Sequence, residues 1–283
     1  MSLQPVLGDE RMSQGASMLN LSYAPNVSWL FPDLVFADRI RAVAEAGFAA
    51  FEFGFPSRVD VPAVEALREE YGLQVALFNL DVSVWDGKCR GYLADPRHRD
   101  EFERKFEQAL ELAGRLKCRC LMVPVGNRVP ELAREAQKEH IVETLRRAAP
   151  LAEEQDLILT IEALNQFDNP GYYLDSSREG IEIVQAVDHV CVRFQYDFYH
   201  MQLLEGNLIN TFTRNVEYIG HFQVADAPGR HEPGTGEINF PQVLAGVAAS
   251  GYRGFVGLEY RPSAEEGAAL GWLPVEARAS LPD

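Results

Sequence analysis

The stretch LILTIEAL, residues Leu157–Leu164, is an apolar run that contains a single carboxylate, Glu162. A continuous apolar run of this length is typical of a strand in a parallel sheet, because such a strand is covered on both faces. A carboxylate inside the run is expensive to bury unless it is paired or binds a metal ion. The stretch therefore predicts a buried strand with a functional carboxylate near its end.

Seven other stretches have the same apolar, β-rich character, and segments with helical periodicity alternate with them. The strand-like stretches are Met18–Ala24, Ala49–Phe55, Leu73–Leu80, Cys118–Val125, Val190–Asp197, Ile219–Asp226 and Gly254–Tyr260. The helical segments are 33–47, 61–72, 96–116, 131–154, 176–187, one after Met201, and 240–251. The tail after the last strand resembles an eighth helix, interrupted by Gly and Pro. Eight strand–helix units of about 30 residues each predict an α/β fold, a single (β/α)8 TIM barrel. A doubly wound open sheet is the alternative, and the absence of a GxGxxG motif after the first strand disfavours it.

The length and composition fit one such domain. The chain has 283 residues, of which 47% are apolar, and its formal net charge is −16. We expect residues 1–16 to be a flexible leader and residues 17–283 to form the barrel. The acidic balance argues against a general nucleic-acid or anionic-membrane surface, because phosphate groups are bound by clustered cations. No apolar run is long enough to cross a membrane. The four cysteines lack the CxxC pairs of a zinc site, so we interpret them as reduced thiols of a cytoplasmic protein. The oligomeric state stays open, and a homo-oligomer is compatible with the sequence.

Polar side chains occupy the ends of the last four predicted strands, which is where TIM barrels carry their active sites. These side chains are Glu162, Asp197, Gln223 and Glu259. Three carboxylates and one amide form an all-oxygen site, which suits Mg²⁺ or Mn²⁺ better than zinc. The alternative is that each is an ordinary surface residue at the terminus of its strand.

Histidines are few, which makes their positions informative. Three of the six lie at the predicted active end: His200, His221 and His231. His231 follows Arg230 in GRHEPGTGEINF (Gly229–Phe240), a stretch with no apolar residue until Ile238. No helix or strand favours that composition, so we expect a loop at the mouth of the barrel.

Three longer segments resemble the hydroxypyruvate isomerase family, within the larger xylose-isomerase-like barrel superfamily. They are QYDFYHMQLLEGNL (195–208), GHFQVADAPGRHEPGTGEINF (220–240) and GYRGFVGLEYRP (251–262), and the resemblance extends over roughly Met18–Leu273. It implies an aldose–ketose isomerase of carbohydrate and glyoxylate metabolism that converts hydroxypyruvate to 2-hydroxy-3-oxopropanoate (tartronate semialdehyde) through a metal-stabilised cis-enediolate. It also implies a divalent metal held by Glu162, Asp197, Gln223 and Glu259, with Glu162 and Glu259 as acid/base groups.

Two departures from the family pattern leave the exact substrate open. The fifth predicted strand ends IEALN where relatives usually have IEPIN, and Asp81 and Ser83 stand where small or apolar residues are more usual.

A small 2-keto acid would need local positive charge, because the carboxylates of the site would repel its own carboxylate. We expect Arg230 and His231 to supply that charge, with His200 as a further substrate-binding residue and with bidentate arginine geometry matching a carboxylate. Lys88 and Arg90, after the third predicted strand, could close over the same place. A cation at a loop mouth contributes weakly to folding, so replacement of Arg230 should change stability little.

Four other functions are alternatives. A ketose 3-epimerase would use the same scaffold and glutamate pair, but such epimerases usually have histidine at the position of Gln223. A dehydratase would abstract a proton and then lose water. An apurinic endonuclease would need several zinc-binding histidines and a basic face. A non-catalytic barrel would be expected to lose at least one of the four ligands, and none is lost.

Overall fold

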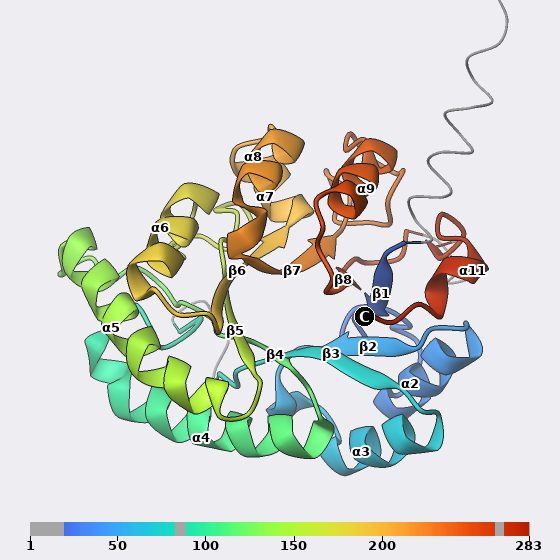
Figure 1. Ribbon diagram of the computed structural model, residues 1–283, viewed down its shortest axis with the longest axis horizontal. Coiled ribbons are helices and arrows are strands. Elements are labelled where there is room, and N and C mark those ends of the chain that lie inside the picture. Colours follow the sequence, from blue (N-terminus) through green and yellow to red (C-terminus); the bar gives the residue numbers. More distant parts are fainter. Residues whose placement is uncertain (1–19, 83–88, 264–268, 283) are drawn as a thin grey trace, which may run out of the picture.

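The computed structural model describes residues 20–82, 89–263 and 269–282, so the leader predicted for residues 1–16 lies outside the described residues. Eight parallel strands form one sheet, surrounded by helices (Figure 1). The strands are β1 Ser22–Pro25, β2 Ala50–Phe53, β3 Gln74–Asn79, β4 Cys120–Met122, β5 Ile158–Glu162, β6 Val192–Asp197, β7 Ile219–Val224 and β8 Phe255–Leu258. Each lies within the strand that the sequence predicts or extends one residue past it.

The sheet closes into a barrel. Neighbouring strands follow chain order, and β1 pairs with β8 in parallel register. Just beyond β1, a parallel bridge joins Asn26 to Glu52 on β2, and the backbone N–H of Val27 donates to the Glu52 carbonyl at 2.9 Å. This closure confirms the predicted (β/α)8 barrel.

The helices are α2 Phe36–Glu45, α3 Val61–Glu70, α4 Arg99–Leu116, α5 Arg134–Glu153, α6 Ser177–Val187, α7 Phe198–Leu204, α8 Leu208–Asn215, α9 Phe240–Ala249 and α11 Val275–Arg278. Short 3-10 turns cover Pro56–Arg58, Pro96–His98 and Val216–Tyr218. No helix within the described ranges is long and apolar enough to span a bilayer.

Local sequence explains where several helices start. Ser176 caps α6, because its hydroxyl accepts the backbone N–H of Glu179, and Asp60 caps α3 by accepting that of Ala63. Both caps satisfy donors that a helix terminus otherwise leaves unpaired. The single helix predicted after Met201 is wrong. Two helices, α7 and α8, occupy this region, because Gly206 and Asn207 adopt left-handed φ angles of 62° and 48° that interrupt a helix.

Helix α7 begins directly at the end of β6, without a loop. The ring of Phe198 stacks on that of Phe222 at 5.5 Å and contacts Phe212 edge-on at 5.7 Å. These apolar contacts hold the first turn of α7 against β7 and α8. The next two residues, Tyr199 and His200, are thereby held over the end of the barrel.

Candidate active site

A cavity of about 920 Å³ opens at the carboxyl ends of the strands. Residues at or just beyond the ends of the strands line it, among them Trp29, Glu162, Tyr199, His200, Arg230 and Glu259. This is the face on which TIM barrels carry their active sites.

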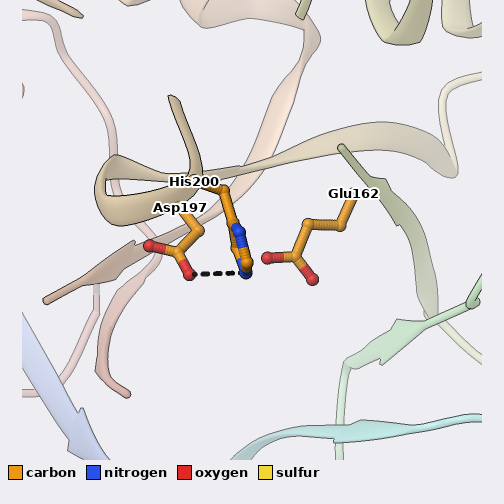
Figure 2. Close-up of side chains that lie close together, drawn as sticks. All are labelled: Glu162, Asp197 and His200. Atoms are coloured by element: carbon orange, nitrogen blue, oxygen red, sulfur yellow. Dashed lines mark ion pairs between the residues drawn. The ribbon is translucent and has the colours of Figure 1, made fainter. Parts of the chain in front are cut away.

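Glu162, Asp197 and His200 lie close together, and Glu162 and His200 line this cavity. Glu162 ends β5, Asp197 ends β6, and His200 lies on α7 three residues later. One potential ligand atom from each lies within 4.8 Å of the others, and all three side chains are buried. Figure 2 shows the Glu162 carboxylate and the His200 ring turned toward one another beside Asp197.

The donor set fits a divalent cation. Among the described residues, Oε1 of Glu162 is buried and has no hydrogen-bond partner. A buried carboxylate oxygen that has no hydrogen-bond partner is energetically unfavourable. An oxygen that ligates a metal ion would lack such a partner, because the ion takes that place. The carboxylates of Glu162 and Asp197 are hard oxygen ligands of the kind that Mg²⁺ and Mn²⁺ prefer.

The raised pKa values of the carboxyl groups also fit a site for a cation. Burial, and then the charges of Asp197 and Glu259, raise the pKa of Glu162 well above its usual range. Burial raises the pKa of Asp197 to about 6, and it raises that of Glu259 to about 8 although Arg230 opposes the rise. The site therefore has too little positive charge of its own to keep all its carboxylates ionised. Groups with raised pKa values also suit proton transfer near neutral pH.

His200 presents a hydrogen-bond donor toward the site. Its Nδ1 accepts the backbone N–H of Asn165 at 3.1 Å and lies 2.8 Å from the Nδ2 of the same residue. A backbone N–H can only donate, so Nδ1 carries the lone pair. Burial lowers the pKa of His200 well below its usual value. The neutral ring therefore carries its proton on Nε2, which lies 3.7 Å from Oδ2 of Asp197.

Gln223 is buried on β7, where it pairs in register with Asp197. Its Oε1 accepts from Nε2 of Gln195 at 2.8 Å, and its Nε2 donates to Oε1 of Glu52 at 2.7 Å. The amide is thus held between neighbours on β6 and β2.

Glu259 follows β8 directly. Its Oε1 accepts from the indole N–H of Trp29 at 3.0 Å and from Nδ2 of Asn26 at 3.4 Å, while its Oε2 accepts from Arg230 at 2.8 Å. All four predicted ligands thus lie at the carboxyl end of the barrel, but Glu259 is already engaged by three donors.

Arg230 lies deeper than an exposed loop mouth would place it. Its guanidinium packs over the rings of Trp29 and Tyr199, at 4.6 and 5.2 Å, and its side chain is 13% exposed. It pairs with Glu259 at 2.8 Å and with Asp197 at 3.3 Å. Its Nε is buried and has no partner within the described residues.

The loop turns inward because of Asp226. The carboxylate of this buried residue accepts the backbone N–H groups of Ala227, Gly234 and Ile238, which draws both arms of the loop together. The backbone N–H of Arg230 in turn donates to the Asp226 carbonyl, and its φ of 58° is left-handed.

Two of the other predicted substrate-binding residues, His231 and Arg90, do not line the cavity. Nδ1 of His231 lies 2.7 Å from the Arg261 carbonyl, and His231 does not line the cavity. Arg90 is buried and donates to the Pro170 carbonyl at 3.4 Å, also away from the cavity lining. Lys88 and Ser83 lie outside the described residues. Asp81 pairs with Lys105 on α4.

Sequence reasoning overlooked several residues near the site, of which Glu52 is the clearest. It is fully buried on β2 and contacts Asn26, His221 and Gln223. The signal that identified Glu162 was present here too, because Glu52 is a carboxylate inside the apolar run AFEF. Trp29 and Tyr199 carried no comparable signal, since aromatic residues are equally common in cores.

Comparisons with known proteins agree with this geometry. The profile of the xylose isomerase-like TIM barrel family matches residues 40–274. Hydroxypyruvate isomerase of Escherichia coli (strain K12) is 36% identical over 256 residues, covering 89% of this chain and 98% of that protein. 2-Oxo-tetronate isomerase of Cupriavidus necator is 36% identical over 251 residues, covering 89% and 96%. Both of these relatives are isomerases, the class of enzyme expected from the sequence.

Solved structures share the fold. A crystal structure of AP endonuclease, family 2, from Brucella melitensis superposes with a TM-score of 0.86 at 33% identity, covering 89% of this chain and 97% of that one. A D-psicose 3-epimerase from Clostridium cellulolyticum H10 has a TM-score of 0.71 at 20% identity, covering 89% of each chain, which shows the fold alone. The chain belongs to the xylose isomerase-like TIM barrel family, and within it to the group of hydroxypyruvate isomerase relatives.

Proposed function

We propose that the protein is an intramolecular isomerase of a small 2-keto acid with a hydroxyl group on the carbon next to the carbonyl. Hydroxypyruvate, converted to 2-hydroxy-3-oxopropanoate, is the first candidate. The observation that carries the proposal is the pair of largely buried glutamates with raised pKa values, Glu162 and Glu259, three strands apart around one cavity. The isomerase relatives, at 36% identity over most of the chain, support the same class of reaction.

The two glutamates transfer the proton in this proposal. One carboxylate removes a proton from the hydroxymethyl carbon, and the electron pair of that C–H bond forms the double bond of a cis-enediolate. The neighbouring carbonyl carbon then takes up that proton. The hydroxyl proton of the former hydroxymethyl group passes to the former carbonyl oxygen, and the hydroxymethyl oxygen becomes the aldehyde oxygen. No oxidant is needed, because one carbon is oxidised as its neighbour is reduced. A carboxylate with a raised pKa can both accept and return a proton near neutral pH.

We assign Glu162, Asp197, Gln223 and Glu259 as the residues that would hold a divalent cation, Mg²⁺ or Mn²⁺. Such an ion would bind adjacent substrate oxygens and stabilise the negative charge of the enediolate. Its fit rests on the unpartnered Oε1 of Glu162 and on the shortage of positive charge beside the carboxylates.

The other polar groups would orient the substrate. The Nε2–H of His200 faces the site and would donate to a substrate oxygen. Arg230, clamped between two aromatic rings beside Glu259 and Asp197, is the cation placed to attract the carboxylate of a keto acid. Arg58 and Arg261 also line the cavity and would add positive charge at its mouth. His231 and Arg90 do not line it, so we assign them no substrate contact.

Two competing functions use the same barrel. A ketose 3-epimerase would remove and return the proton at one carbon, and an endonuclease is the activity named for the Brucella relative. The net charge of −16 disfavours a nucleic-acid substrate, and His200 is the one histidine that lines this cavity within the described residues. We therefore place small-molecule isomerisation first. We also propose a cytoplasmic site of action, since the buried Cys118, Cys120 and Cys191 are free thiols.

Product analysis tests the proposal. Chelator-treated protein would be incubated in D₂O with hydroxypyruvate, 2-oxo-tetronate or D-fructose, each with and without Mg²⁺ or Mn²⁺, and followed by ¹H NMR. We expect a keto acid to isomerise with deuterium incorporation at the carbon that is protonated, and only when the metal is present. Epimerisation of the neutral ketose without turnover of either keto acid would replace the proposal by the epimerase. Cleavage of abasic-site DNA without either activity would replace it by the endonuclease.

A further inference from the structure

A fully buried carboxylate, Glu52, lies inside the barrel next to the proposed metal ligands. Its Oε1 accepts from Nδ2 of Asn26 at 3.0 Å and from Nε2 of Gln223 at 2.7 Å, while its Oε2 lies 2.7 Å from Nε2 of His221. Glu52 is 0% exposed, and its three partners are each 2% exposed. Such a group is costly to bury, and apolar residues of similar size usually serve a core equally well. Its presence therefore calls for a purpose other than holding the barrel together.

The barrel makes room for this carboxylate. Gly257 on β8 faces it, and a Cβ at that position would lie 2.4 Å from Oε2 and 2.6 Å from Oε1 of Glu52. Carbon atoms do not approach carboxylate oxygens this closely, so any other residue at position 257 would displace the group. The glycine at position 257 on β8 thus leaves the space that the Glu52 carboxylate on β2 occupies.

Hydrogen-bond directions around Glu52 are determined by a neighbouring backbone group. The backbone N–H of Ser28 donates to Oδ1 of Asn26 at 3.0 Å, and a backbone N–H cannot accept. The Nδ2 end of Asn26 must therefore face Glu52, whose Oε1 has to be an acceptor. Gln223 faces that same oxygen and must present its own N–H₂ there. Its carbonyl oxygen consequently points the other way, toward Gln195 at 2.8 Å.

We propose that Glu52 is a positioning residue that orients the Gln223 amide so that its oxygen is presented to the divalent cation. A glutamine side chain has a donor end and an acceptor end of nearly equal shape, and only the oxygen can ligate Mg²⁺ or Mn²⁺. By accepting the N–H₂ group, Glu52 excludes the flipped amide, while the imidazole of His221 hydrogen-bonds the second oxygen of Glu52. This inference rests on the metal site of the proposed function.

The test measures Mn²⁺ affinity by isothermal titration calorimetry of chelator-treated protein, with thermal unfolding followed by circular dichroism. Glu52→Met keeps the length of the side chain but removes the acceptor. We expect it to weaken Mn²⁺ binding by about 10–100-fold, the usual effect of removing a group that orients a ligand, while the protein still unfolds cooperatively. Because Glu52 acts on the ion only by orienting Gln223, adding Glu52→Met to Gln223→Met should cause little further loss of Mn²⁺ affinity.

The matched control is Glu52→Gln. Asn26 forces the new amide to turn its oxygen toward Gln223, and Nε2 of His221 can accept the new N–H₂ group when the ring carries its proton on Nδ1. We therefore expect Glu52→Gln to bind Mn²⁺ within about threefold of wild type, because orientation requires an acceptor rather than a charge. Equal weakening in Glu52→Gln and Glu52→Met would overturn the orientation argument.

The outcomes separate this inference from the proposed function. If the wild type binds no Mn²⁺, the metal site itself is wrong and the inference falls with it. If the wild type binds Mn²⁺ and Glu52→Met binds it equally well, only the inference is overturned. Should Glu52→Met fail to fold, a crystal structure of the wild type with Mn²⁺ decides. Gln223 must then ligate the ion through Oε1 while its Nε2 stays bonded to Glu52, and ligation by Glu52 itself would contradict the proposal.

Discussion

Replacing Arg230 by methionine should destabilise the metal-free protein, and more so at high pH. Arg230 pairs with Glu259 at 2.8 Å and Asp197 at 3.3 Å, and the Asp197 side chain is 0% exposed. Removal of one partner from a buried ion pair typically costs about 3–5 kcal/mol, because the remaining charge stays buried without compensation. The expectation of a small effect, which assumed an exposed loop cation, does not apply to a side chain that is 13% exposed.

The pH dependence follows from the carboxylates. Their pKa values are about 6 for Asp197 and about 8 for Glu259, and Arg230 lowers both. Without Arg230 these pKa values rise, so the folded variant binds more protons than the folded wild type in this range. Stability of the variant relative to wild type must then fall as the pH rises. We expect a loss of about 1–2 kcal/mol near pH 5, where the carboxyl groups are protonated and lose hydrogen bonds but no ion pair, and about 3–5 kcal/mol near pH 9.

Arg261→Met is the matched control. The Arg261 guanidinium lies over the same Trp29 ring, at 4.9 Å compared with 4.6 Å for Arg230, but Arg261 is exposed and makes no ion pair with any described residue. Its loss should cost less than about 1 kcal/mol at either pH. Urea denaturation of chelator-treated proteins, followed by circular dichroism near pH 5 and pH 9, measures the difference. Equal losses in the two variants, or a pH-independent loss for Arg230→Met, would refute the reasoning.

The same variant tests the assigned substrate contact. Arg230→Met should reduce kcat/KM toward a 2-keto acid by about 2–4 kcal/mol in transition-state terms, and should affect a neutral ketose much less. Similar losses on charged and neutral substrates would assign Arg230 to the structure of the site instead.

Three further predictions concern the site and its support. Glu162→Gln and Glu259→Gln should each lower kcat by at least about 10²-fold and suppress deuterium exchange from solvent into the substrate; normal turnover in either variant would exclude that residue from proton transfer. Stabilisation by excess Mn²⁺, measured as the rise in Tm over chelator-treated protein, should grow from about pH 4 to about pH 8. In that range Asp197 and Glu259 retain protons in the folded protein that the unfolded chain has released, and the ion must displace them; a pH-independent rise would contradict this. Gly257→Ala should destabilise by about 1–3 kcal/mol or more, because its Cβ would lie 2.4 Å from Glu52, and the additional change Glu52→Ala should recover part of the loss. Unchanged stability in the single variant would show that the contact is relieved elsewhere.

The sequence predicted the strands of the barrel well because each is a short apolar run with one dominant environment. The pattern of LILTIEAL depends only on burial of both faces, which is a local property of a parallel strand. The break between α7 and α8 was missed because the apolar residues around Gly206 and Asn207 have helical periodicity. Periodicity alone does not show whether these two residues adopt helical or left-handed φ angles.

The candidate site likewise has residues that local sequence indicates and surroundings that it does not. Glu162, Asp197, Gln223 and Glu259 could be named as candidates because a polar side chain at the end of an apolar strand is a local anomaly, and Glu52 showed the same anomaly without being recognised. The surroundings of these residues were not identifiable. Partners drawn from strands far apart in the chain meet only once the barrel closes, and hydrogen bonds, burial and pKa shifts depend on distances of a few ångströms.

Arg230 and Glu52 illustrate what only the tertiary structure decided. From sequence, Arg230 belongs to an exposed loop, but three backbone N–H groups converging on Asp226 fold that loop inward and bury the guanidinium among carboxylates. Glu52 and Gln223 are 171 positions apart, and barrel closure brings their side chains to 2.7 Å. The sequence by itself determined the barrel and the chemical character of its open end, because both follow from local burial patterns. Which donor faces which acceptor was decided by the closed barrel, because a hydrogen bond has a direction that composition and spacing do not encode.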